Sequence, residues 1–207
     1  MMKMKKWNQL VISLILLLNS GFLLQMILSG HHGRILVTLS LYLTVWIPKV
    51  VRSIFKVQIP ERVECVYLIF LFLAQFLGSI VNLYASIYWF DSFVHFVSGI
   101  LTALFGIAVL VWFQKYDHQS IAFNIFFMIA FSLMVASFWE FFEFTMDQIS
   151  GGDTQKVIET GVADTMKDMI VACLGAILVS IYYGFEKSTR KKLFFYHYEK
   201  EFGCKYE

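Results

Sequence analysis

The sequence predicts an all-α membrane protein, a polytopic transmembrane bundle of about six helices. Hydrophobic residues make up 58% of the 207-residue chain and charged residues only 15%, and phenylalanine occurs 22 times. Soluble domains contain about 45–50% apolar and about 25% charged residues, so the composition is typical of a chain solvated by lipid. Two prolines and the absence of a Ser/Gly-rich stretch indicate one integral-membrane domain over residues 1–207.

Six apolar runs are long enough to cross a hydrocarbon core, which needs about 20 residues of helix. Their approximate bounds are 7–29, 35–55, 63–84, 93–113, 121–144 and 166–185, and a basic tail over residues 186–207 follows them. The first run has a longer apolar core than a secretory signal peptide, which favours a retained helix over a cleaved one. The second run is the weakest because Pro48 and Lys49 interrupt it, although a proline kink near a helix end is tolerated in membranes.

Lysine and arginine alternate between rich and poor connections, which predicts the orientation of the helices. The rich set comprises Lys3, Lys5, Lys6, Lys49, Arg52, Lys56, Arg62, Lys115, Lys187, Arg190, Lys191 and Lys192. The first, third and fifth connections hold only Arg34, Lys156 and Lys167. Both termini are therefore expected in the cytoplasm. The net charge of +2 is too small to indicate a nucleic-acid partner, so the expected partner is the lipid bilayer.

Three pairs of ionisable residues lie at the ends of the last three runs, each pair at about one-turn helical spacing. They are Asp91 and His95, Glu140 and Glu143, and Asp164 and Asp168. The predicted orientation brings all three pairs to the extracytoplasmic leaflet. Charged groups inside a bilayer are costly and are usually paired, bound to a metal or exposed to a cavity. The pairs are thus expected to converge on one site.

Helical periodicity supports this convergence. Asp91, His95, Ser98 and Thr102 follow one another at i, i+4, i+7 and i+11, which forms one polar stripe on the fourth run. The glycines of the fourth and sixth runs allow close approach of neighbouring helices, as small residues do in membranes. These are Gly99, Gly106 and Gly175.

Crowded carboxylates in a medium of low dielectric need neutralisation, and the sequence leaves three ways to provide it. The favoured interpretation is a divalent metal ion, Zn, Mn or Fe, because carboxylates and imidazole are ordinary ligands for such ions. The candidate ligands are Asp91, His95, Glu140, Glu143, Asp164 and Asp168. The alternatives are a structural network of hydrogen bonds and ion pairs, and a proton relay.

The sequence does not decide whether the protein is an enzyme. A metal site at the outer leaflet suits a hydrolase or transferase that acts on a lipid or envelope precursor. Glu140 or Glu143 would then be the catalytic base, since an apolar setting raises the pKa of a carboxylate toward the pH at which the enzyme works. The alternatives are a transporter of divalent cations or protons, and a non-catalytic accessory protein of the membrane. The oligomeric state is left open.

Three ordered motifs resemble the YjdF-like family, small bacterial inner-membrane proteins of unknown function. They are Trp89-Phe-Asp91-Ser-Phe-Val-His95-Phe, Trp139-Glu140-Phe-Phe-Glu143 and Asp164-Thr165-Met-Lys-Asp168-Met. The resemblance covers roughly residues 63–184 and implies a multi-pass protein of the bacterial plasma membrane with a shared intramembrane site. Family members often have a basic residue after the first aspartate and glycine before the histidine, where this chain has Ser92 and Val94.

Overall fold

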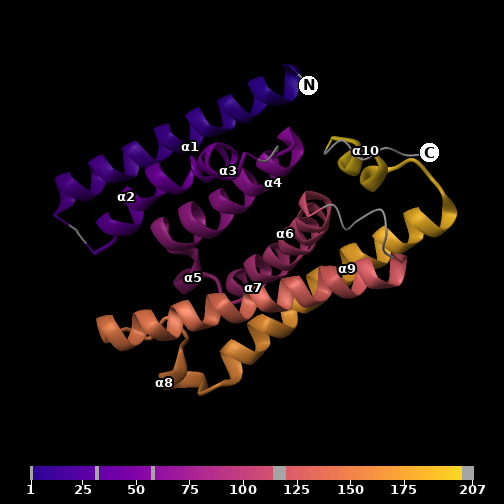
Figure 1. Ribbon diagram of the computed structural model, residues 1–207. Helices are drawn as coiled ribbons and strands as arrows, with labels where there is room; N and C mark the ends of the chain where they lie inside the picture. Colours follow the sequence, from indigo (N-terminus) through magenta and orange to yellow (C-terminus); the bar gives the residue numbers. More distant parts are fainter. Residues whose placement is uncertain (1, 31–32, 57–58, 114–119, 202–207) are drawn as a thin grey trace. The chain divides into compact units, whose positions relative to one another are not determined.

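The computed structural model describes residues 2–30, 33–56, 59–113 and 120–201 (Figure 1). Within these ranges the regular elements are helices, and no strand is present. Five helices are long and apolar enough to cross a membrane, and one bent pair of helices would supply a sixth span. The predicted fold class, an all-α protein with about six membrane-spanning helices, is confirmed. The cytoplasmic placement of both termini stays a prediction, and Lys115, one of the residues behind it, lies outside the described ranges.

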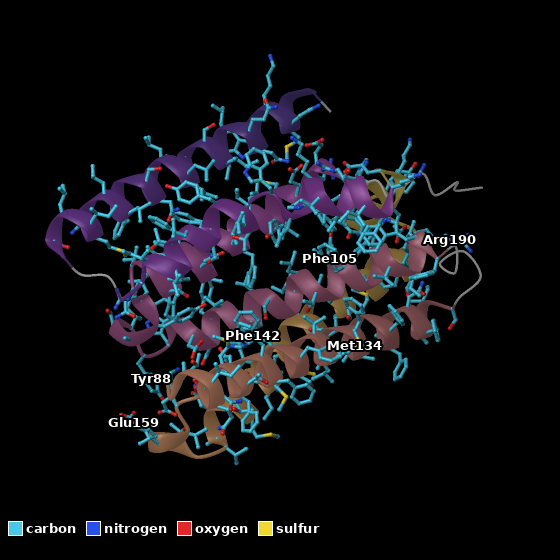
Figure 2. The ribbon with its side chains drawn as sticks, turned by 60° about the vertical axis from the view of Figure 1, so that its left-hand side comes forward. Tyr88, Phe105, Met134, Phe142, Glu159 and Arg190 are labelled. Atoms are coloured by element: carbon cyan, nitrogen blue, oxygen red, sulfur yellow. The ribbon has the colours of Figure 1, made fainter. Side chains whose placement is uncertain are left out.

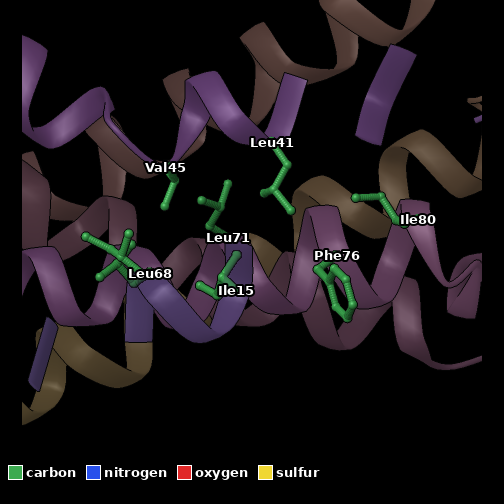
Figure 3. Close-up of a cluster of buried hydrophobic side chains, with 8 residues drawn as sticks. Ile15, Leu41, Val45, Leu68, Leu71, Phe76 and Ile80 are labelled. Carbon is green, nitrogen blue, oxygen red and sulfur yellow. The ribbon is translucent and has the colours of Figure 1, made fainter. Parts of the chain in front are cut away.

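The chain forms two compact units, Met1–Asp91 and Ser92–Glu207. The first contains α1 (Met2–Ser29), α2 (Ile35–Thr44), α3 (Ile47–Phe55), α4 (Glu61–Leu71), the π-helix η1 (Phe72–Ile80) and α5 (Leu83–Ser86). Its core is a cluster of aliphatic side chains and one phenylalanine from α1, α2, α4 and η1 (Figure 3). The single-domain organisation stays a prediction.

Two breaks in the first unit follow from local residue chemistry. The predicted run 35–55 is divided into α2 and α3, which meet at 45°, and Pro48 lies in the first turn of α3, where a missing N–H costs least. The predicted run 63–84 ends at Ile80 rather than Tyr84. There Asn82 adopts a left-handed conformation with φ of 75°, which asparagine tolerates better than most residues and which stops the helix.

The second unit contains α7 (Ile121–Ser150), α8 (Val157–Thr160), α9 (Ala163–Thr189) and α10 (Phe194–Glu201), together with nearly all of α6 (Phe90–Trp112). Helices α7 and α9 form an antiparallel hairpin that α8 joins at one end (Figure 1). Asn124 near the start of α7 donates to the hydroxyl of Tyr183 near the end of α9, at 2.9 Å. The acid-bearing end of α7 consequently lies beside the acid-bearing start of α9.

Large apolar side chains cover the outer faces of this hairpin. Met134 and Phe142 on α7 are 45% and 53% exposed, and Figure 2 labels both. Leu174 and Leu178 on α9 are similarly exposed. The inner face carries small and polar residues instead, as in helices whose outer face contacts lipid tails.

Glycine brings the backbones of α6 and α9 together. A Cβ atom on Gly99 of α6 would lie 1.9 Å from the carbonyl oxygen of Ala172 on α9. A Cβ atom on Gly175 of α9 would lie 2.2 Å from the carbonyl oxygen of Phe96 on α6. Neither position has room for any other residue, so the two glycines fix how these helices cross. The predicted role of both as close-approach residues agrees with these contacts.

Candidate metal centre

The crossing of α6 and α9 places a histidine against an aspartate. His95 lies one helical turn before Gly99, and Asp168 lies one turn before Ala172, so each faces the partner helix just beyond the contact point. The Nε2 atom of His95 is 3.8 Å from Oδ2 of Asp168. The two side chains are only 11% and 5% exposed. A titratable pair that is this well enclosed is a candidate functional site.

Helix α6 adds a third group. Asp91 precedes His95 by one turn and projects on the same face of α6. One ligand atom each from Asp91, His95 and Asp168 can be chosen so that all three lie within 4.8 Å of one another. Among the described residues, this is the group of acids, histidines and cysteines whose spacing suits a metal ion.

The distance between His95 and Asp168 indicates which kind of interaction the two side chains can make. At 3.8 Å the two atoms are farther apart than a hydrogen bond, which spans about 2.7–3.2 Å for nitrogen and oxygen. Two such ligands on a tetrahedral ion, each at about 2.0–2.2 Å from the metal, would be about 3.4 Å apart. A small side-chain adjustment would therefore accommodate an ion between them.

Asp164, another predicted ligand, has two lysine partners instead. Lys167 Nζ is 2.8 Å from its Oδ1 atom, and Lys156 Nζ is 3.2 Å from its Oδ2 atom. Lys167 also lies 4.0 Å from Oδ1 of Asp168. Asp164 is thus neutralised by side chains of α9 and of the preceding connection, and it is not one of the three clustered groups.

The two glutamates of α7 also have other contacts. Glu140 is 5% exposed and accepts a hydrogen bond from the side-chain amide of Gln155, at 3.2 Å. The same amide lies 3.2 Å from the hydroxyl of Thr165, at the start of α9. Glu143 accepts a hydrogen bond from the indole N–H of Trp139, at 2.9 Å on the exposed side of the helix. The structure therefore brings together three of the six predicted ligands and places the other three outside that group.

Another acid at this end, Asp147, orders the connection between α7 and α9. The carboxylate of Asp147 accepts hydrogen bonds from the backbone N–H groups of Thr154, at 2.8 Å, and Gln155, at 3.0 Å. Helix α7 ends at Ser150 because Gly151 adopts a left-handed conformation, with φ of 69°, that suits glycine. These contacts turn the chain back so that the side chain of Gln155 enters the interface.

The sequence did not predict the burial of Gln155, Glu186 and Glu199. Gln155 lies in a polar connection with no periodic signal, so nothing in the sequence pointed to its burial between α7 and α9. Glu186 and Glu199 lie in a segment predicted as a basic tail, yet they are 1% and 0% exposed. An acid directly after an apolar run and directly before Lys187 was the signal available for Glu186.

A family described as "Predicted membrane protein (DUF2238)" matches residues 10–188 of the chain. An uncharacterised protein of Thermotoga maritima is 33% identical over 132 residues, which cover 62% of this chain. The matched region spans 65% of the length of that relative. No solved structure matches the chain. These findings agree with the predicted multi-pass membrane protein, while the YjdF-like assignment stays a prediction.

Proposed function

The chain belongs to the DUF2238 family of predicted membrane proteins, and we propose that it binds one divalent metal ion through Asp91, His95 and Asp168. One observation carries the proposal. Two separate helices bring an imidazole and a carboxylate to 3.8 Å from each other, and a second carboxylate lies one turn away on one of those helices. The other three predicted ligands have partners that already account for their positions.

Charge supports this choice. Two carboxylates and one neutral imidazole carry a formal charge of −2, which a divalent cation neutralises. Lys167 pairs with Asp164 at 2.8 Å and lies 4.0 Å from Asp168. A mixed set of oxygen and nitrogen ligands suits Zn, Mn or Fe.

A site with three protein ligands leaves coordination positions open, which is typical of catalytic rather than structural centres. When bound there, a metal ion would polarise a substrate oxygen and lower the pKa of a coordinated water. We therefore propose hydrolase or transferase activity on a lipid or envelope precursor. Glu140, which accepts a hydrogen bond from Gln155, or Glu143 would accept the proton.

The orientation of α9 supports a site that opens at the extracytoplasmic face of a bacterial plasma membrane. Asp164 and Asp168 lie in the first two turns of this helix, and Lys187 lies in its last turn. Basic residues favour the cytoplasmic ends of membrane helices. On this basis the acid-rich end of the second unit would face outward.

Metal content of the purified full-length protein tests the proposal. His95→Ala and Asp168→Asn should each lower metal affinity by more than about 10–100-fold, the loss typical of removing a residue that hydrogen-bonds to a ligand. Asp164→Asn is the matched control, because it removes a carboxylate one turn away on the same helix that is already paired with lysines. It should leave the metal stoichiometry unchanged.

Elemental analysis after purification without chelator, and titration of the metal-free protein, would give these values. Undiminished metal in His95→Ala would refute the proposed ligand set. No metal in the parent protein under metal-replete conditions would favour a structural network or a proton relay.

A further inference from the structure

The segment after α9 folds back on the second unit and forms α10. The carboxylate of Glu186, near the end of α9, accepts hydrogen bonds from three backbone N–H groups at the start of this segment. They belong to Leu193 at 3.1 Å, Phe195 at 2.9 Å and Tyr196 at 2.7 Å. A carboxylate at a helix N-terminus satisfies donors that the helix cannot and complements the helix dipole. Glu186 thereby fixes where α10 begins.

The remaining contacts anchor one face of α10. Glu199 is fully buried and forms an ion pair with Lys187. The Tyr198 hydroxyl donates to the carbonyl oxygen of Leu104 on α6, at 2.8 Å, and Phe195 packs edge-on against Tyr183. The carboxylates of Glu186 and Glu199 therefore both make their contacts inside the protein.

The basic residues of the same segment are left outside. Arg190, Lys191, Lys192 and Lys200 are all exposed. Lys191 Nζ lies 5.4 Å from the ring centre of Phe185. Lys192 and Lys200 lie 5.2 Å and 5.9 Å from the ring centre of Tyr196, so two ammonium groups approach one ring. Within this segment Glu186 and Glu199 are buried, whereas the four bases and Glu201 are exposed.

We propose that this surface, formed by Lys191, Lys192 and Lys200 with their aromatic partners, binds the headgroups of acidic phospholipids. Aromatic and basic residues beside the end of a membrane helix match the chemistry of the lipid interface. Two like charges beside Tyr196 repel each other, and a phosphate between them would relieve that repulsion. The anchored face of α10 holds the bases in place before lipid binds, which lowers the ordering cost of binding.

Each basic residue near an anionic membrane surface contributes about 1 kcal/mol, which is about fivefold in affinity. Neutralising three of them should therefore weaken binding by about 100-fold. The triple variant Lys191→Gln, Lys192→Gln, Lys200→Gln removes these charges without changing Glu186 or Glu199.

The test uses the full-length protein in detergent, titrated with phosphatidylglycerol or phosphatidylcholine and observed by native mass spectrometry. The parent should prefer phosphatidylglycerol, and the triple variant should bind both lipids alike. The matched control is Lys5→Gln, Lys6→Gln, Lys49→Gln, which removes the same charge from exposed residues of the first unit. It should keep most of the preference.

A triple Lys→Arg variant at positions 191, 192 and 200 should retain binding, which separates loss of charge from loss of folding. Equal loss of lipid preference in the control would show that net charge alone attracts the lipid, and would overturn the proposal. Retained preference for phosphatidylglycerol in the triple Lys→Gln variant at positions 191, 192 and 200 would also overturn the proposal.

Discussion

Replacing Gly99 with alanine tests how closely α6 and α9 pack. The added methyl carbon would lie 1.9 Å from the carbonyl oxygen of Ala172. An ordinary carbon–oxygen contact is about 3.3 Å, so the backbones would have to separate by about 1.4 Å. Both atoms belong to helix backbones or lie directly on them, which means that no flexible side chain can move aside. Overpacking of this kind typically costs about 1–3 kcal/mol, and sometimes more.

Glycine replacements elsewhere in the chain provide a graded control series. A Cβ atom on Gly106 would lie 3.4 Å from the nearest atom, the Cα of Met128, which is close to an ordinary contact. Gly21, in the middle of α1, has no such neighbour within 4 Å. Because alanine favours helix by about 1 kcal/mol over glycine, Gly21→Ala should be neutral or stabilising. The expected order of stability is Gly21→Ala, then Gly106→Ala, then Gly99→Ala.

Thermal unfolding of the three variants in one detergent would measure this order. Separation of the helices by more than 1 Å would also move His95 away from Asp168, so Gly99→Ala should bind metal more weakly even when folded. A Gly99→Ala protein as stable as Gly21→Ala would refute the close crossing. Loss of stability with unchanged metal affinity would keep the crossing but refute its role in positioning His95.

Two further predictions concern the contacts of α10. Glu186→Ala leaves three backbone N–H groups without their acceptor, at about 1–3 kcal/mol for each buried donor, and should speed amide hydrogen exchange in α10. Burial, and then the carboxylates of Glu199 and Glu201, raise the pKa of Tyr198 above its ordinary value. Because the unfolded chain would release this proton near pH 10 and the folded chain would keep it, stability should fall as the pH rises above about 10. Tyr198→Phe should remove this alkaline loss, as unfolding measured across pH would show, and should cost about 0.5–1.5 kcal/mol at neutral pH.

Hydropathy predicted the spans well because lipid solvation acts on every residue of a helix. The expected run 121–144 begins where α7 begins, at Ile121, but the helix continues to Ser150. The run 166–185 corresponds to α9, which extends to Ala163 and Thr189. Both differences have one cause: hydropathy marks only the apolar part of a helix, whereas backbone hydrogen bonding continues through polar residues until a residue such as Gly151 ends it.

The site was harder to predict, because helical spacing shows which residues share a face of a helix but does not show which residues of another helix they contact. Asp164 and Asp168 are separated by four residues and share a face of α9, so the sequence offered both as ligands. Their surroundings differ because they lie one turn apart along α9. Asp164 meets Lys156 from the connection, while Asp168, one turn further along, meets His95. The approach of His95 to Asp168 depends on the contact between Gly99 and Ala172, and the sequence indicated this glycine as a packing residue without showing which residue it contacts.

The buried acids of α9 have different kinds of partner along the helix. At the start of α9, Asp164 pairs with lysines, whereas Asp168 lies near the imidazole of His95 and is 4.0 Å from Lys167. Toward its end, Glu186 is neutralised by backbone N–H groups instead of a cation. The three buried acids of this helix therefore have different partners, and the 3.8 Å between Asp168 and His95 is longer than a hydrogen bond. This distance is one reason why we propose the metal ion at Asp168 and structural roles for the other two acids.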